Sequence, residues 1–234
     1  MSAQEIITQL KSFATKDRKK INEWFFKTGP GQYSEHDQFI GVRMPQIRLI
    51  AKKYFKEISF NKLDQLINHP THEIRHCALI ILVNKYQTGN KHEAFNYYLD
   101  NLDSVNNWDL VDTTTPHIIG DYLFHHPDKR SLLYDWTNSN NLWERRIAIV
   151  ATFAFIKQGE LITTLNICQL LLKDQHDLIH KAIGWMLREV YKKNSDICKT
   201  FLRENYAQLP RTTLRYAIER MQESERLRYL KGIF

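Results

Sequence analysis

The amino-acid sequence predicts an all-α protein built from stacked helical pairs, and three observations carry this prediction. Apolar residues recur at steps of three and four along almost the whole chain, which is the period of an amphipathic helix. Eight glycines and six prolines are few for 234 residues, so helices are seldom interrupted. The third observation is a four-residue phrase that recurs at a regular interval: a basic residue, any residue, alanine and an aliphatic residue.

This phrase sets the length of the repeating unit. It occurs as HCAL from His76, RIAI from Arg146, HKAI from His180 and RYAI from Arg215, with first residues 70, 34 and 35 positions apart. Because 70 is twice 35, one disguised copy belongs near residue 111, inside the segment NNWDLVD. A period of about 35 residues is typical of a helical solenoid, and about six helical pairs would fill residues 1–234 as one domain.

Turn-forming residues separate the predicted elements. Residues 1–36 are expected to form an N-terminal cap of two helices and a loop. The loop belongs to the turn-rich stretch KTGPGQYSEHD at 27–37, which separates the cap from the next helix. The next helix, MPQIRLIAKKYF, has proline in its first turn. The apolar run ALIILV at 78–83 lies within a longer helical period, so we interpret it as buried helix instead of strand. The later turns INHPTHE, YQTGNKHE, HHPDKR and QLPRTT are too short to be interdomain linkers.

Charge and composition favour an intracellular protein that binds a polyanion. The formal net charge is +7 and the sequence pI is about 9.2, which makes nucleic acid the first partner to test. No apolar run approaches the roughly 18 residues of a membrane-spanning helix, and the first twenty residues lack the order of a secretory signal. Cys77, Cys168 and Cys198 are odd in number and far apart, so we expect buried thiols in a reducing, cytoplasmic compartment.

The inner helices of a solenoid line one concave surface, which is therefore where functional residues are expected. Trp108 and Asp112 are four residues apart and share one face of the predicted central helix. Asp103 or Ser104 can cap this helix, and Pro116 limits its far end. The next two inner helices add further residues that would make the groove basic and partly aromatic: Arg145, Arg146, Lys181, Trp185 and Arg188.

Each of these residues also has a purely structural interpretation. Periodicity alone places Trp108 and Trp185 in the core, because both continue an apolar spacing. Asp112 could be a surface carboxylate or the partner of Arg146 in a structural salt bridge. Arg145 and Arg146 cannot both point the same way, so one of them is expected to pair structurally. Asp109 is interpreted as a favourable first-turn charge that takes no part in chemistry.

The sequence gives no support for a metal, a cofactor or several common enzyme classes. His72 and His76, and again His176 and His180, have the i, i+4 spacing found at zinc sites, but no third ligand is evident nearby. We therefore expect neither a metal site nor a cofactor. Phosphate-binding loops, GxGxxG, HExxH and GxSxG are all missing from the sequence, so the corresponding chemistries have no basis in it.

Five segments together resemble a known family, the AlkD-type DNA alkylpurine glycosylases, which are built from HEAT-like helical repeats. The resemblance covers nearly the whole chain and is specific through the order and spacing of its segments: GVRMPQIRLIAKKY, EIRHCAL, NNWDLVD, NLWERRIAI and KAIGWMLRE. It implies a superhelix with a basic concave groove. It also implies monofunctional excision of cationic purines such as 3-methyladenine and 7-methylguanine from duplex DNA, without flipping the base into a pocket.

The resemblance also assigns roles to individual residues. The family's catalytic aspartate matches Asp112, and its two sugar-contacting tryptophans match Trp108 and Trp185. Its arginine near the lesion matches Arg146, with the adjacent Arg145 as the alternative. Relatives that lack the aspartate and tryptophan are not expected to be active, and this sequence has both.

The chemistry of the lesion agrees with a single carboxylate. An N-alkylated purine already carries positive charge, so it leaves as a neutral base and needs no general acid, unlike ordinary glycoside hydrolysis. A fixed carboxylate such as Asp112 can stabilise the cation that develops on the sugar and orient the attacking water. Lys181, Arg188 and the two neighbouring arginines would neutralise DNA phosphates without reading sequence.

Two other function classes stay open. One is a non-catalytic helical solenoid that binds nucleic acid or a protein in its concave groove. The other is a helical scaffold for acidic proteins, which predicts no affinity for DNA at low salt. For the enzyme we expect a monomer, because the groove must stay open for duplex DNA, and we expect it on the nucleoid when it is bound.

Overall fold

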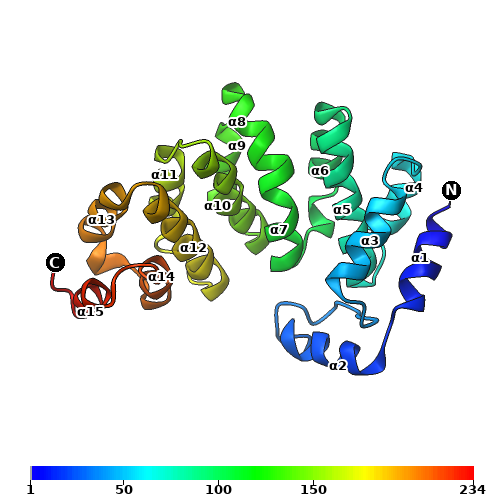
Figure 1. Cartoon of the computed structure of the whole chain (residues 1–234), viewed down its shortest axis with the longest axis horizontal. Helices are drawn as coiled ribbons and strands as arrows, with labels where there is room; N and C mark the ends of the chain where they lie inside the picture. Colours follow the sequence, from blue (N-terminus) through cyan, green and yellow to red (C-terminus); the bar gives the residue numbers. More distant parts are fainter. Residues whose placement is uncertain (1) are drawn as a thin grey trace. The chain divides into compact units, whose positions relative to one another are not determined.

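The computed structural model describes residues 2–234, and over this range the protein is all-helical (Figure 1). No strand forms among the described residues; the only β-type pairing there is an isolated bridge between Gln38 and Thr71. The predicted all-α class is therefore confirmed. The chain divides into two compact units, Met1–Thr114 (unit 1) and Thr115–Phe234 (unit 2). The single domain of residues 1–234 that the sequence led us to expect stays a prediction.

Over its described residues, unit 1 contains seven helices and one short 3-10 turn. The N-terminal pair starts with helices capped by Ser2 and Thr15, and the helix after the 27–37 loop has proline in its first turn, as predicted. The bounds are α1 Ala3–Ser12, α2 Lys16–Phe25, α3 Met44–Tyr54, α4 Phe60–Ile67, α5 His72–Thr88, α6 Lys91–Asp100, η1 Leu102–Ser104 and α7 Trp108–Thr115, whose last residue is the first of unit 2.

Helix α5 forms the centre of unit 1. Residues 78–83, the run that could have formed a strand, are all buried within this helix, so the helical interpretation is confirmed. Helices α3, α4 and α6 pack against α5. Because α5 is covered on several sides, even the polar residues of its first turns are buried, among them His72, Glu73 and His76. Such groups need partners inside the protein.

Unit 2 continues the helical pattern. Pro116 begins a π-helical turn immediately after α7, in agreement with the predicted limit at this proline. Helix α12 lies at the centre of the unit and packs against α10, α11, α13 and α14. The bounds are η2 Pro116–Gly120, α8 Asp121–His125, η3 Pro127–Lys129, α9 Ser131–Thr137, α10 Leu142–Lys157, α11 Ile162–Leu171, α12 Asp177–Lys193, α13 Ser195–Glu204, η4 Tyr206–Gln208, α14 Arg211–Ala217 and α15 Glu223–Lys231.

The recurring phrase marks equivalent helices. Its four copies lie on α5, α10, α12 and α14, and residue 111, where the disguised copy was expected, lies on α7. Within unit 2, the successive phrase-bearing helices α10, α12 and α14 pack against each other in that order. The helical-repeat class predicted from the spacing is thus confirmed. The basic concave groove stays a prediction.

The loop before α3 is fastened to α5 by a buried carboxylate. Glu73, 2% exposed, accepts hydrogen bonds from the backbone N–H groups of Ile40, Gly41 and Val42, the shortest being 2.8 Å from Gly41. Gly41 has φ +85°, and a Cβ there would lie 2.2 Å from the carbonyl oxygen of Thr15. Glycine is therefore required where this loop meets the start of α2.

The core holds the three cysteines predicted to be buried. Cys77, Cys168 and Cys198 are free thiols and each is buried. Burial raises the pKa of Cys77 and of Cys198 to about 12, and it also raises the pKa of Cys168. Among the described residues, no helix has both the length and the apolar composition needed to cross a membrane.

Candidate functional site

Trp108 stands at the first position of α7 and is held by aromatic side chains of the α2 region. Its indole is half-buried and stacks on the Phe26 ring, with centroids 5.3 Å apart and an interplanar angle of 23°. The Phe25 ring meets it edge-on at 5.6 Å. Trp108 is thus neither a core residue nor fully exposed. One face of the indole rests on Phe26, which restricts its orientation.

The cap of α7 differs from the prediction. Asn107 supplies it: its side-chain Oδ1 accepts the backbone N–H of Trp108 at 2.8 Å. Asp103 and Ser104 instead lie in η1, where the Ser104 hydroxyl bonds to Asn68 at 3.0 Å. The predicted cap was wrong because the helix begins several residues later than the periodicity indicated. Asn107 is fully buried, and its amide nitrogen also donates to Ser34 at 2.6 Å.

Asp112 follows Trp108 by one helical turn, so both side chains project from the same face of α7. The Asp112 side chain is half-buried, like that of Trp108. The same helix turn is fixed to α5 by the contacts of Asp109 with His72 and His76. A tryptophan and a carboxylate are therefore presented together from one rigid turn.

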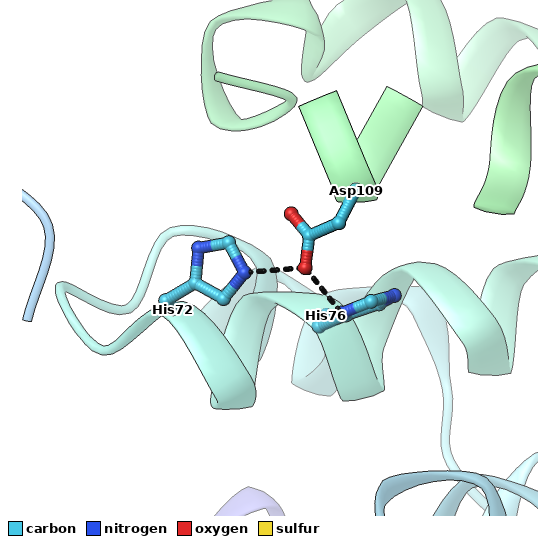
Figure 2. A group of neighbouring side chains, drawn as sticks. All are labelled: His72, His76 and Asp109. Carbon is cyan, nitrogen blue, oxygen red and sulfur yellow. Dashed lines mark hydrogen bonds and ion pairs between the residues drawn. The ribbon is translucent and has the colours of Figure 1, made fainter. Parts of the chain in front are cut away.

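A buried network of charged groups fixes the first turn of α7 to α5. His72 donates from Nε2 to Asp109 Oδ2 at 2.9 Å and from Nδ1 to Asp37 Oδ2 at 3.2 Å. Figure 2 shows His72 and His76 on α5 and Asp109 on α7 turned toward one another; His76 Nδ1 lies 3.3 Å from the same Asp109 oxygen. Arg75 forms an ion pair with Asp37, which completes the network.

The charges in this network support one another. Burial alone would lower the pKa of His72, but the carboxylates of Asp109 and Asp37 outweigh burial and raise this pKa to about 9. Burial would raise the pKa of Asp109, yet His72 and His76 hold it well below its usual range. The pKa of Asp37 is also lowered, against the effect of burial, by His72 and Arg75. His72 is therefore an imidazolium shared by two carboxylates.

The interpretation of Asp109 as a simple first-turn charge was thus incomplete. It does lie in the first turn of α7, but it is only 9% exposed and forms the centre of the buried network. Asp109 is also a third potential metal ligand beside His72 and His76, which the sequence did not indicate. The ligand atoms of these three side chains lie within 4.8 Å of one another. Because both nitrogens of His72 already donate to carboxylates, we interpret the group as an ion-pair network.

The predicted basic residues of unit 2 are largely engaged with the protein itself. Arg145 donates from Nε to Asp174 Oδ2 at 2.6 Å and from Nη1 to the carbonyl oxygens of Ser139 and Asn140 at 2.9 and 3.1 Å. Arg146 is 4% exposed and donates to the carbonyl oxygen of Leu178 on α12. Both arginines therefore have structural partners, whereas structural pairing was expected of only one.

The two residues of α12 that were predicted to bind phosphates, Lys181 and Arg188, also form ion pairs. Lys181 Nζ lies 2.8 Å from Asp177 Oδ2, one turn earlier on the same helix. Arg188 pairs with Glu219, and its Nε lies 3.6 Å from a carboxylate oxygen of Glu189. The Lys181 side chain is 40% exposed, and that of Glu219, the partner of Arg188, is 50% exposed. Both ion pairs therefore lie at the surface, where solvent screens them.

Trp185 is half-buried on α12, and its position depends on close packing with α14. Its ring lies 5.6 Å from that of Phe153 on α10, at an angle of 44°. The preceding Gly184 faces α14, where a Cβ would lie 2.5 Å from the Tyr216 Cβ and 2.7 Å from the Thr213 carbonyl oxygen. The glycine of the GWML sequence therefore lets α12 approach α14, and this approach places Trp185.

The predicted site residues divide between the units. Trp108 and Asp112 belong to unit 1 and lie together on α7, while Arg145, Arg146, Lys181, Trp185 and Arg188 belong to unit 2 on α10 and α12. Sequence reasoning missed Phe26, Asp37 and Asn107, which orient Trp108 or the start of its helix. The signal that the sequence offered was the set of polar residues in the first turns of α5, a helix whose later turns are apolar. Such residues indicate that polar partners lie nearby.

A helical-repeat protein that presents a tryptophan and a carboxylate from one helix is the class that these observations define. The model of the family described as "DNA alkylation repair enzyme" matches residues 6–221 of this chain. The chain therefore belongs to that family, which gives it an enzyme role in DNA repair and makes DNA its partner.

A solved structure agrees with the fold. The structure titled "Predicted DNA alkylation repair enzyme from Enterococcus faecalis" is similar with a TM-score of 0.72 and 17% sequence identity, over 90% of this chain and 97% of that one. At this identity the likeness concerns the fold alone. No curated protein matches the sequence.

Proposed function

We propose that this protein is a monofunctional DNA glycosylase that hydrolyses the N-glycosidic bond of cationic N-alkylated purines in duplex DNA. The observation that carries the proposal is the pairing of Trp108 and Asp112 on one face of α7, in a member of a DNA alkylation repair family. The sequence resemblance assigns the catalytic role to this aspartate. The substrates proposed from it are 3-methyladenine and 7-methylguanine.

The reaction needs little from the protein beyond a fixed negative charge. The N-glycosidic bond breaks and its electron pair leaves with the purine, which becomes neutral because it was already cationic. Positive charge then develops on the deoxyribose, where the Asp112 carboxylate stabilises it. A water molecule attacks C1′ of the sugar, its proton passes to solvent, and an abasic site remains. No general acid is required for this leaving group.

The tryptophans are proposed to contact the sugar. The face of an indole carries partial negative charge, which favours a neighbouring cation. Trp108 is suited to this role because Phe26 supports one side of its ring and leaves the indole half-exposed. Trp185 and Arg146 are proposed to contact the DNA at the lesion. Lys181 and Arg188 are proposed to bind phosphates, which requires them to exchange their surface ion pairs for DNA. Arg145, which Asp174 holds, is proposed to be the structural member of the Arg145 and Arg146 pair.

The decisive experiment measures release of free base from duplex DNA that contains 7-methylguanine. The native protein is compared with Asp112→Asn and with Asp103→Asn, a matched control in which an exposed aspartate of η1 loses the same charge. We expect release by the native protein and by Asp103→Asn, and a loss of at least about a hundredfold in Asp112→Asn.

The alternative outcome separates an enzyme from a binding protein. If the folded native protein binds DNA but releases no base from 7-methylguanine or 3-methyladenine duplexes, the glycosylase proposal fails. A non-catalytic helical repeat that binds DNA would then be the better description. If Asp112→Asn releases base at the native rate, the assignment of the carboxylate fails while the glycosylase activity stands.

A further inference from the structure

Helix α2 exposes large apolar side chains to solvent. Ile21, Trp24 and Phe25 occupy positions i, i+3 and i+4 of this helix and are 50%, 74% and 50% exposed. The helix is held to unit 1 from its other side, through the buried residues Asn22 and Phe26. Three large apolar side chains together on one exposed face are unusual for a surface that stays in water. We call Ile21, Trp24 and Phe25 the α2 face.

Positive charge surrounds the α2 face. Helix α2 contains four basic residues and two acidic ones in ten residues, and the exposed Lys27 follows it. One of the two acids, Glu23, is 3.7 Å from Lys19, so part of the negative charge is already paired. The Lys27 ammonium lies 5.2 Å from the centre of the Trp24 ring. The face therefore combines exposed aromatic rings with an excess of cations.

The α2 face is continuous with the candidate site. The centre of the Phe25 ring lies 5.6 Å from that of the Trp108 ring, and the neighbouring Phe26 stacks on the same tryptophan. Phe25 is thus both part of the α2 face and a neighbour of Trp108, and Trp24 precedes it in the same helix. Figure 1 shows α2 at the edge of unit 1, before the loop that leads to α3.

We propose that the α2 face is a second contact surface for duplex DNA, with Trp24 packing against the sugars or exposed base edges that flank the lesion and Lys20 and Lys27 binding the neighbouring phosphates. This inference rests on the proposed function, because it takes the DNA at Trp108 as its starting point. Aromatic rings that pack on nucleotides and lysines that neutralise phosphates are a combination that nucleic acid fits. An uncharged protein partner would leave the lysines without a counter-charge.

The test uses the intact protein and an unmodified fluorescent DNA duplex, so its result does not depend on base release. Binding is measured by anisotropy at several salt concentrations for the native protein, Trp24→Ala and Lys20→Gln. Matched controls are Leu170→Ala, which removes a 53% exposed apolar side chain from α11, and Lys173→Gln, which removes an exposed charge beyond that helix. Trp24 is mostly solvent-exposed, so its replacement removes little packing, and thermal unfolding checks this.

The expected result is specific to each variant. Trp24→Ala should weaken DNA binding about tenfold. Lys20→Gln should reduce the slope of log affinity against log salt by about one. Native affinity and slope in both variants would overturn the proposal. It would also fail if Leu170→Ala weakened binding as much as Trp24→Ala, because the effect would then not belong to the α2 face.

Failure of this proposal and failure of the glycosylase proposal give different results. If the native protein releases 7-methylguanine and Trp24→Ala binds DNA with native affinity, the glycosylase activity stands and the α2 contact fails. If Trp24→Ala loses affinity for DNA and the native protein releases no base, the α2 contact stands and the glycosylase activity fails. A third outcome is possible: the protein binds anionic vesicles, Trp24→Ala weakens this binding, and Trp24→Ala leaves the affinity for DNA unchanged. That outcome would assign the α2 face to a lipid surface and overturn the DNA proposal.

Discussion

His72 and Asp109 form an ion pair in the interior of unit 1, with 2.9 Å between His72 Nε2 and Asp109 Oδ2. The pair joins α5 to the first turn of α7, the turn that begins with Trp108 and leads to Asp112. The position of both proposed catalytic side chains therefore depends on a buried charge that itself contacts no DNA. The first two predictions concern this pair.

Asp109→Asn should destabilise the protein by about 3 kcal/mol, because it removes the main counter-charge of a buried imidazolium and leaves that charge with Asp37 alone. Urea unfolding followed by circular dichroism measures the change. Asp103→Asn, at an exposed position, should change the free energy of unfolding by less than about 0.5 kcal/mol. Equal stabilities of the two variants would show that the Asp109 charge is not structural.

Stability should fall on the alkaline side through His72. Its pKa is raised to about 9 in the folded protein from about 6.5 when unfolded, so its charged form stabilises the fold fully below pH 6.5. This stabilisation declines as the pH rises and is lost at about pH 9. The free-energy difference between the native protein and His72→Gln should therefore shrink between these pH values. A difference that stayed constant in urea titrations at pH 6, 7.5 and 9 would contradict the assignment.

Gly184→Ala should lower stability by roughly 1–3 kcal/mol, because the new methyl group would lie 2.5 Å from the Tyr216 Cβ and force α12 away from α14. Gly29→Ala is the control: its Cβ would meet only the flexible end of the Gln32 side chain, at 3.1 Å. Differential scanning calorimetry should show a lower Tm for Gly184→Ala alone. The same change should slow base release, because Trp185 follows the glycine.

Arg145→Gln should affect stability more than DNA binding. The Arg145 side chain is 19% exposed and joins Asp174 to the turn before α10, so its loss should cost about 1–3 kcal/mol. Asp174→Asn should lose a similar amount, and the double variant should lose less than the sum of both. The salt dependence of DNA binding should stay native. A decrease of about one in the salt slope would instead identify Arg145 as a phosphate contact.

Local patterns predicted most of the fold. The three- and four-residue apolar spacing, the proline of α3 and the recurring phrase each depend on neighbours within a few turns, and all correspond to helices. The spacing even placed α7 where no copy of the phrase is visible. Periodicity could not locate the first residue of α7, because this depends on the Asn107 side chain, whose other contacts come from Ser34 and Asp37.

The candidate site was predictable only in part, for the same reason. Trp108 and Asp112 share a helix face by their spacing alone. The partners that hold them are 37 or more residues away: His72 contacts Asp109, and Phe26 supports Trp108. Nothing in a single sequence specifies which helices will meet. The polar residues in the first turns of α5 indicated that buried partners were needed without naming them.

The burial of the three cysteines has a consequence for the conditions in which a protein of this family works. Alkylating agents react with thiolates as well as with purine nitrogens, so an enzyme of alkylation repair is exposed to the reagents that damage its substrate. Cys77, Cys168 and Cys198 are enclosed in the core, and burial raises the pKa of each. Their sulfur atoms are thus both uncharged and shielded, and the folded protein offers these electrophiles no reactive thiol.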